Sequence, residues 1–221
     1  MNRPSHKRSA AAQGLADSTL PSALLLHACC APCAGGVLES LLEAAVAVTV
    51  WFDNSNIHPP SEYERRLDEM RRFAGRLGVP LLCADYQPGT WLAAMKGLED
   101  IPERGERCKL CFRWRLESSA GLAARLGLSA FATTLGISRW KNLAQVNAAG
   151  QAAAAVQPGV FFLPVNWRKG GGTQRMVEMA RREGFYQQEY CGCRFSLRDG
   201  NAWRLARGRQ PIACAAEDLS D

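Results

Sequence analysis

The sequence predicts an α/β fold: a single domain with a mostly parallel sheet that helices flank. Three observations lead to this prediction. Short apolar runs alternate along the chain with segments of helical periodicity, which is the pattern of strand–helix–strand units. The chain has 221 residues, within the size of one domain, and shows no internal repeat. Hydrophobic residues make up 47% and charged residues 22% of it, which indicates a real core and argues against a disordered chain.

Five apolar runs, rich in Val, Leu, Phe or Thr, have the length of buried strands. The predicted strands are residues 23–28, 47–52, 79–84, 130–134 and 160–165. Each run is far shorter than the roughly 20 apolar residues that cross a bilayer, so we expect no membrane span.

Five further segments have the apolar spacing of helices and are predicted to cover the sheet. They are residues 35–45, 61–77, 111–126, 140–151 and 173–183. The segment 61–77 is the best supported, because Ser61 and Glu64 form a capping-box pattern at its start and Gly78 follows as a stop signal. Leu67 and Met70 belong to its apolar face.

The two ends of the chain lack this patterning. Residues 1–20 are predicted to be a flexible N-terminal extension, residues 21–199 the α/β domain that carries the function, and residues 200–221 an Arg-rich C-terminal tail.

Charge and cysteine content bound the class of protein. Lys and Arg number 27 against 21 Asp and Glu, a net charge of +6, which suits a polyanion but is also common in proteins that bind none. Nine cysteines are an odd number, and a chain of this length does not need disulfide staples. We therefore expect a reducing, cytoplasmic location, where clustered cysteines usually serve metal or redox chemistry.

Most of the cysteines form three groups at predicted strand or helix ends. The groups are Cys29, Cys30 and Cys33 after the first strand, Cys108 and Cys111 in a C-x-x-C at a helix start, and Cys191 and Cys193 in a C-x-C. Because ligands of α/β folds gather at the carboxyl ends of strands, the first group lies where a site is expected. Cys83, at another strand end, is interpreted as a small core residue, and Cys214 as a bystander in the tail.

The spacing of these thiols allows more than one chemistry. A C-x-x-C occurs in zinc sites, iron–sulfur sites and thiol oxidoreductases, and a second thiolate pair completes four soft ligands. The adjacent pair Cys29 and Cys30 is unusual for zinc and favours an iron–sulfur cluster. A disulfide across Cys191 and Cys193 would be strained and easily reduced, which suits a two-electron relay, although the pair can also serve as two more metal ligands.

Two other classes of function stay open on this evidence. A zinc-stapled RNA-binding module would use the same four thiolates structurally. A thiol–disulfide oxidoreductase would use Cys108 and Cys111 as its active pair.

Several motifs in order resemble one known family. They are HACCAPC at 27–33, NSNIHP at 54–59 with EYERR at 62–66, PERGERCKLCF at 102–112, TTLGIS at 133–138 and YQQEYCGCRFS at 186–196. They are similar to the cobalamin-independent epoxyqueuosine reductases, the QueH type, and the resemblance runs from about Leu24 to Ser196.

The resemblance implies that the chain reduces epoxyqueuosine to queuosine at the wobble position of tRNA anticodons, the last step of queuosine synthesis. Its partners would be that tRNA and an electron donor. It implies a [4Fe-4S] cluster held by Cys29, Cys30, Cys108 and Cys111, and a redox-active pair, Cys191 and Cys193. The implied fold is similar to the nucleotide-binding PP-loop class, but the Ser-Gly-Gly phosphate loop of that class is missing, so ATP is not implied.

Other candidate residues complete the expected site. Asp85, just beyond a strand, is a candidate catalytic residue, and Cys33 with an aspartate is a candidate holder of an additional iron ion. His27 is a possible proton donor or a structural residue. The candidate contacts for tRNA phosphates are Arg65, Arg66, Arg107, Arg139, Lys141 and Lys169, and the candidate stacking residues are Trp91, Trp140 and Trp167. Asp53 and residues 166–169 depart from the family pattern.

Overall fold

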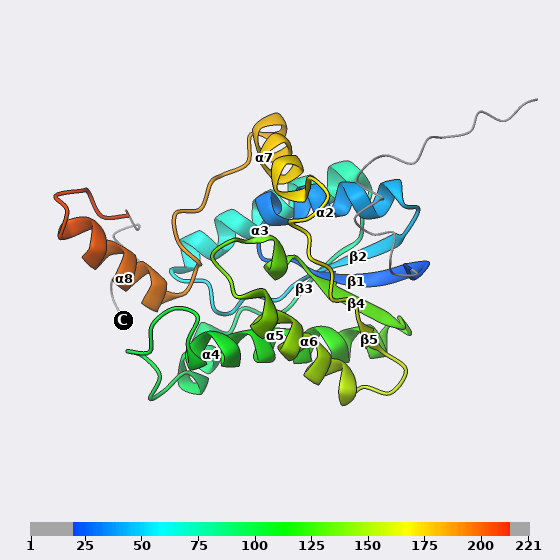
Figure 1. Cartoon of the computed structure of the whole chain (residues 1–221), viewed down its shortest axis with the longest axis horizontal. Coiled ribbons are helices and arrows are strands. Elements are labelled where there is room, and N and C mark those ends of the chain that lie inside the picture. The colour runs from blue at the N-terminus through cyan, green and yellow to red at the C-terminus, as the bar shows by residue number, and fades with distance from the viewer. Residues whose placement is uncertain (1–19, 213–221) are drawn as a thin grey trace, which may run out of the picture.

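Five parallel strands form one sheet in the order β3-β2-β1-β4-β5 in the computed structural model, which describes residues 20–212 (Figure 1). The strands are β1 (Ala23–His27), β2 (Ala47–Phe52), β3 (Leu81–Cys83), β4 (Ala130–Thr133) and β5 (Phe161–Phe162). The predicted α/β fold and all five predicted strands are confirmed, with the two edge strands β3 and β5 shorter than predicted. The likeness to the PP-loop class stays a prediction.

Helices cover both faces of this sheet (Figure 1). One face carries α2 (Ala31–Glu43), α3 (Pro60–Leu77) and α7 (Gly172–Glu183), and the other carries α5 (Glu106–Arg125) and α6 (Leu143–Ala155). Two further helices, α4 (Pro88–Ala94) and α8 (Arg194–Leu205), pack against the start of α5. Among the described helices, none combines the length and the apolar composition that crossing a membrane would require.

Side chains of the central strand divide between the two layers. Leu24 and Leu26 of β1 pack with α2, α3 and α7, whereas Leu25 between them packs with α5 and α6. All three are fully buried. A strand covered on both faces needs apolar residues at successive positions, which explains the unbroken apolar run in the sequence.

Helix α2 begins at Ala31, earlier than the predicted start at Gly35. Pro32 is tolerated there because the first turn of a helix has no intrahelical partner for its N–H. Gly35 is needed for packing, since a Cβ at this position would lie 2.5 Å from Cγ of Met179 on α7. The glycine therefore marks a close approach of two helices and not the beginning of one.

The C-terminal part of the chain is more ordered than its composition indicates. Helix α8 runs through position 200, where the Arg-rich tail was expected to begin. Neither α4 nor α8 was among the predicted helices. Cys214 and residues 1–19 of the expected extension lie outside the described residues, and the division of the chain at 20 and 199 stays a prediction.

The order of the strands determines where a site can form. From β1 the chain passes into α2 on one face of the sheet, and from β4 it passes through a short 3-10 helix (Thr134–Ile137) toward α6 on the other face. Neighbouring strands whose connections leave on opposite faces open a crevice at their carboxyl ends. The segment Cys29–Cys33 follows β1 at this crevice.

Two glycines on the α5/α6 layer give a matched test of the packing. A Cβ at Gly150 of α6 would lie 2.6 Å from the ring of Phe162, whereas a Cβ at Gly121 of α5 would find its nearest neighbour at 3.6 Å. We expect Gly150→Ala to lower the free energy of unfolding by about 1–3 kcal/mol through overpacking. Gly121→Ala should raise it by up to about 1 kcal/mol, because alanine favours the helix. Urea denaturation of both variants checks this, and equal effects would contradict the packing.

Candidate metal centre

Three thiols converge where β1 ends and α2 begins. Cys30 is the N-cap residue of α2, in extended conformation, and Cys33 lies in the first turn of the helix. The Sγ atoms of Cys29, Cys30 and Cys33 all lie within 4.8 Å of one another, and those of Cys29 and Cys30 are 3.8 Å apart. In the part of the chain that the structure describes, this is the only close group of three or more potential His, Cys, Asp or Glu ligands.

Hydrogen bonding within this group leaves two protons on three sulfurs and favours the thiolate at Cys29. Cys29 receives hydrogen bonds from Cys30 and Cys33, which hold its pKa well below the ordinary value. The donor Cys30 has a pKa raised well above its usual value, and that of Cys33 is raised to about 12 by its hydrogen bond to Cys29. The unpaired N–H groups at the start of α2 add a partial positive charge. One thiolate, shared by three sulfurs, is therefore ready for a soft metal.

The C-x-x-C pair lies at the start of α5. Cys111 is buried and Cys108 is half-buried, and the backbone N–H of Arg104 donates to the Sγ of Cys108 at 3.3 Å. Burial raises the pKa of both thiols, that of Cys111 to about 11. Both lose their protons when they bind a metal. They lie outside the close group of three.

The C-x-C pair adjoins these two cysteines through the tertiary structure. Cys193 is the N-cap of α8, and its Sγ accepts a hydrogen bond from Ser196 N at 3.4 Å. Cys193 packs in one small apolar cluster with Cys111 and Trp91, and the negative charge of Cys191 acts on Cys111. The tertiary structure thus brings the C-x-C pair next to the C-x-x-C pair.

Gly192 between the two cysteines has no room for a side chain. Its φ is +119°, and a Cβ there would lie 3.0 Å from Nη1 of Arg66 and 3.1 Å from Cγ1 of Ile57. The Nη1 group of Arg66 donates to the carbonyl of Cys191 at 3.1 Å, and His58 N donates to the carbonyl of Gly192 at 2.7 Å. These contacts fix the backbone of the pair.

Cys191 is the second thiolate of the site. A hydrogen bond from Cys193 lowers the pKa of Cys191 to about 5 despite burial, with Lys141 and Arg115 adding positive charge. Cys193, as the donor, has a pKa raised well above its usual value. At neutral pH the pair is therefore one thiolate with one thiol beside it.

This assignment predicts an unusual alkylation profile for the metal-free protein. Iodoacetamide reacts with thiolates, so modification of Cys191 should be half-maximal near pH 5. Burial raises the pKa of Cys83, so its modification should be half-maximal only above the ordinary pKa of a cysteine thiol. Cys193→Ala removes the main cause of the shift and should move the Cys191 midpoint upward, whereas Cys193→Ser keeps a donor. Peptide mass spectrometry measures each site. Coincident profiles for Cys191 and Cys83 would contradict the assignment.

Two cations connect the cysteine groups. Arg115 of α5 is 2% exposed and donates to the backbone carbonyl of Asp53 at 3.3 Å and to Oδ1 of Asn54. Its charge acts on Cys29, Cys111 and Cys191. Arg115 was not among the candidates predicted from the sequence, although its position four residues after Cys111 places both on one helix face.

Lys141 lies beside the thiols. The charges of Cys191, Cys29 and Cys33 outweigh the effect of burial and raise its pKa above the ordinary value, so its ammonium stays protonated. Its predicted contact with tRNA stays a prediction, and the structure places it near thiols of two cysteine groups.

The other basic candidates divide between the interior and the surface. Arg66 is buried against Glu62, with 2.7 Å between Nε and Oε1, and Arg107 is buried with its Nη1 donating to backbone carbonyls of residues 98, 99 and 101. Both guanidinium groups thus hold loops together, although Nε and Nη2 of Arg107 have no hydrogen-bond partner among the described residues and its guanidinium lies over the Phe195 ring at 4.6 Å. Arg65, Arg139 and Lys169 are exposed.

The remaining candidates also have clear positions. His27 is fully buried and hydrogen-bonded at both ring nitrogens, at 2.8 Å to Thr133 Oγ1 and at 3.3 Å to the Asp53 carbonyl, and burial lowers its pKa to about 3. It is a neutral structural residue. Trp91 and Trp167 are core residues, and Trp140 is 64% exposed.

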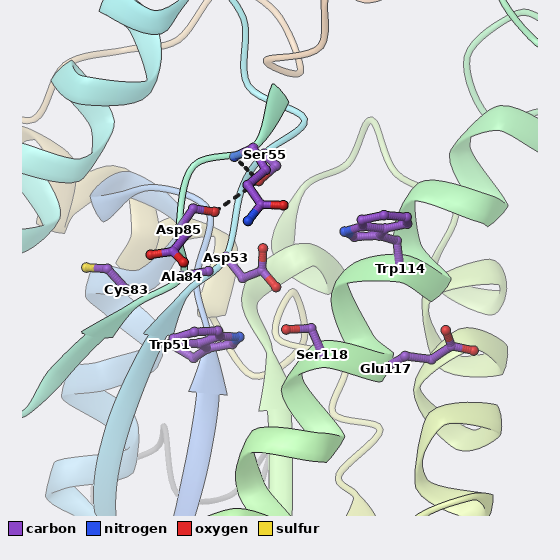
Figure 2. Close-up of a pocket in the computed structure, with 10 residues that line it drawn as sticks. Trp51, Asp53, Ser55, Cys83, Ala84, Asp85, Trp114, Glu117 and Ser118 are labelled. Carbon is purple, nitrogen blue, oxygen red and sulfur yellow. Dashed lines mark hydrogen bonds between the residues drawn. The ribbon is translucent and has the colours of Figure 1, made fainter. Parts of the chain in front are cut away.

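Cys83 and Asp85 lie apart from the metal centre. The interpretation of Cys83 as a core residue is wrong: it is exposed, because β3 is an edge strand with an uncovered end. Asp85 lines a pocket between β2, β3 and α5 and is not part of the close thiol group (Figure 2).

Comparison with known proteins places this site in a family. The family model for epoxyqueuosine reductase QueH matches residues 24–199, a range that includes all three cysteine groups. The chain belongs to the QueH family. Proteins named epoxyqueuosine reductase QueH from Histophilus somni, Haemophilus influenzae and Acinetobacter baylyi are 51%, 50% and 48% identical to it over 189 residues. These alignments cover 86% of this chain and 78%, 77% and 87% of the three QueH proteins.

Proposed function

We propose that this protein is an oxidoreductase that reduces epoxyqueuosine to queuosine at the wobble position of tRNA anticodons. The observation that carries the proposal is the convergence of three cysteine groups, all within the QueH match, on one end of the sheet beside Lys141 and Arg115. A structural zinc site needs four ligands and neither a second thiolate pair nor buried cations. The enzyme is thus favoured over a zinc-stapled module.

The donor set fits an iron–sulfur cluster. The proposed ligands of a [4Fe-4S] cluster are Cys29, Cys30, Cys108 and Cys111, with Cys33 as a further thiol for an additional iron ion. Adjacent thiols such as Cys29 and Cys30 suit a bulky cluster better than a single ion. Trp91 supports this, because its buried indole N–H is directed at the Cys111 sulfur, and hydrogen bonds to ligand sulfurs tune iron–sulfur clusters. When bound, the cluster would supply electrons one at a time.

The C-x-C pair supplies electrons in twos. Converting the epoxide to an alkene takes up two electrons and two protons and releases water. Oxidation of the Cys191 thiolate and the Cys193 thiol to a disulfide gives up two electrons and one proton, and the ammonium of Lys141 supplies the second proton, so the two half-reactions balance. An external reductant must then restore the dithiol. Such a relay begins with Cys191 as the thiolate and Cys193 as the thiol.

Lys141 is suited to bind and protonate the epoxide oxygen, which leaves as water. It keeps its proton on Nζ because three thiols face it, and an ammonium N–H can bind a developing alkoxide and protonate it. Arg115 cannot approach the substrate in the same way, since it is buried and donates to Asp53 and Asn54. Its role is to balance the negative charge of the thiolates.

The surface beside the metal centre is proposed to bind tRNA. Trp140 projects next to Lys141, its ring faces the Arg139 guanidinium at 4.8 Å, and its carbonyl accepts from Arg104 Nε at 2.9 Å. An exposed aromatic ring beside cations is suited to an unstacked base and its phosphates. Arg65 and Lys169 extend the exposed positive charge.

This interface predicts a salt-dependent affinity. Binding of tRNA should weaken linearly on a log–log plot against salt, because each neutralised phosphate releases counterions. Arg139→Ala should lower the affinity and reduce the magnitude of the log–log slope by about 1, the value for one lost phosphate contact. Arg125→Ala is the matched control, since it is exposed at the far end of α5, roughly 25 Å along the helix from Cys108. Filter binding at several salt concentrations measures both, and a flat response would remove tRNA as the partner.

The test of the reaction uses anaerobically purified protein. With a chemical reductant and tRNA that carries epoxyqueuosine, we expect loss of one oxygen atom from the modified nucleoside, measured by mass spectrometry of digested tRNA. A brown, iron- and sulfide-containing protein that performs this conversion supports the proposal. A colourless zinc protein would indicate the RNA-binding module, and a colourless metal-free dithiol the thiol–disulfide oxidoreductase.

A further inference from the structure

A pocket of about 600 Å³ opens between the carboxyl ends of β2 and β3 and the middle of α5 (Figure 2). Its walls combine two indole rings with three carboxylates. The residues that matter are Trp51, Asp53 and Asp85 on the strand side and Trp114, Glu117 and Ser118 on α5. None of the described residues that line it is a lysine or an arginine. Its chemistry therefore favours a flat ligand that carries hydrogen-bond donors and positive charge.

The indole of Trp51 is an unused donor in this pocket. Trp51 is 8% exposed, and its Nε1 is buried without a hydrogen-bond partner among the described residues. Figure 2 shows the nitrogen on the side of the ring that faces Ser118 of α5. A buried N–H without an acceptor is unfavourable, so it points to a ligand that brings an oxygen or nitrogen acceptor.

Asp53 places a buried carboxylate in the wall of the pocket, where the Ser118 side chain is hydrogen-bonded to it. Asp53 is 5% exposed, and burial raises its pKa. The nearby guanidinium of Arg115 donates to the backbone carbonyl of Asp53 and to Asn54, while the Asp53 side chain faces the pocket (Figure 2). A buried carboxylate in this position is a strong acceptor for a cationic N–H donor.

The pocket shares walls with the metal centre. Trp51 pairs with His27 across the sheet, and its carbonyl accepts from Ala28 N at 2.9 Å, directly before Cys29. On the other side, Trp114 packs against the apolar cluster that contains Cys111 and Cys193. A ligand in the pocket would thus lie next to the cysteine groups.

We propose that this pocket binds the substrate's base together with the ammonium group attached to it, an assignment that rests on the proposed function. Epoxyqueuosine is a deazaguanine whose epoxide-bearing ring is joined through a secondary amine that is protonated at neutral pH. Guanine presents N–H donors to a carboxylate such as that of Asp53 and an oxygen to the Trp51 N–H. The indoles offer surfaces for its ring. A metal ion is disfavoured here, since the only close ligand group among the described residues is the thiol group.

The test separates binding from reduction by using a probe without an epoxide. Aminomethyl-deazaguanine keeps the base and the cation, and its binding to the metal-loaded protein is measured by calorimetry and by quenching of tryptophan fluorescence. We expect binding, competitive inhibition of turnover, and weaker binding of deazaguanine without the aminomethyl group. Asp53→Asn, which keeps the side-chain shape, should weaken binding about tenfold or more.

Asp68→Asn is the matched control. It removes one negative charge from an exposed, Arg71-paired aspartate on α3 that does not line the pocket, and it should leave binding unchanged. Trp51→Phe, which removes the unpartnered indole N–H, repeats the test by calorimetry if Asp53→Asn does not fold, and should also weaken binding.

Two results would overturn the proposal: no binding of the probe by the wild-type protein, or equal affinity in the wild-type protein and both pocket variants. The proposed reaction fails independently. Conversion of epoxyqueuosine in tRNA without probe binding rejects the pocket and keeps the reaction. Probe binding with the expected variant effects, but no conversion, supports the pocket and rejects the reaction.

Discussion

Replacing Cys30 or Cys111 with serine is expected to abolish iron–sulfur binding. Serine offers a hard oxygen that is hard to ionise, in place of a thiolate that soft metals prefer. Cys30 is 1% exposed and Cys111 is 9% exposed, so neither water nor another side chain can easily replace the lost ligand. Iron and acid-labile sulfide content after anaerobic reconstitution, with the visible absorption spectrum, measures the loss.

Cys83→Ser is the matched control for this result. Cys83 is exposed at the end of the edge strand β3 and is not part of the thiol group, so its variant should retain the wild-type metal content. Circular dichroism of all three variants shows whether the fold is kept. Full iron and sulfide in both Cys30→Ser and Cys111→Ser would reject the proposed ligands.

Serine at Cys191 or Cys193 is expected to have the opposite combination of effects: retained metal and no multiple turnover. A single thiol cannot cycle between dithiol and disulfide. Without the Cys191–Cys193 dithiol as reductant, the two-electron step cannot be repeated. The pair lies beside Cys111 but at the start of a different helix, α8, where its role can be separated from metal binding. Metal content and turnover of epoxyqueuosine tRNA are measured on the same preparation, with Cys83→Ser as the control for metal content only, because Cys83 lines the pocket proposed for the substrate.

The competing assignment gives a different result in the same experiment. If Cys191 and Cys193 are metal ligands, metal content and activity should fall together. If either serine variant turns over many times at near the wild-type rate, the relay is wrong. Gly192→Ala adds an independent check. The φ of residue 192 is +119°, which alanine rarely adopts, and the added Cβ would crowd Arg66 and displace the cysteine pair. We expect this variant to retain its metal and to turn over more slowly.

Much of the fold was predictable because it depends on local pattern. The buried strands are unbroken apolar runs, and α3 carries its own capping and stop signals, so its predicted bounds differ from the observed start at Pro60 by one residue. Helix α8 was missed because its polar, Arg-rich sequence has few buried residues, of which the structure shows Phe195 and Ser196. The predicted start of α2 is too late, because Gly35 was interpreted as the beginning of the helix. Gly35 instead allows the close packing of α2 against α7, which no local pattern reveals.

The sequence by itself determined the α/β class, the five strands and the cysteine groups, because strand burial and short motifs are properties of neighbouring residues. Only the tertiary structure decided which charges serve the site. Arg66 and Arg107 look like surface cations in the sequence but are buried on backbone carbonyls, while Lys141 and Arg115 lie beside the thiols. The strand order and the packing of α8 against α5 bring these groups together, and because electrostatic effects depend on distance in space and on burial, no local pattern specifies them.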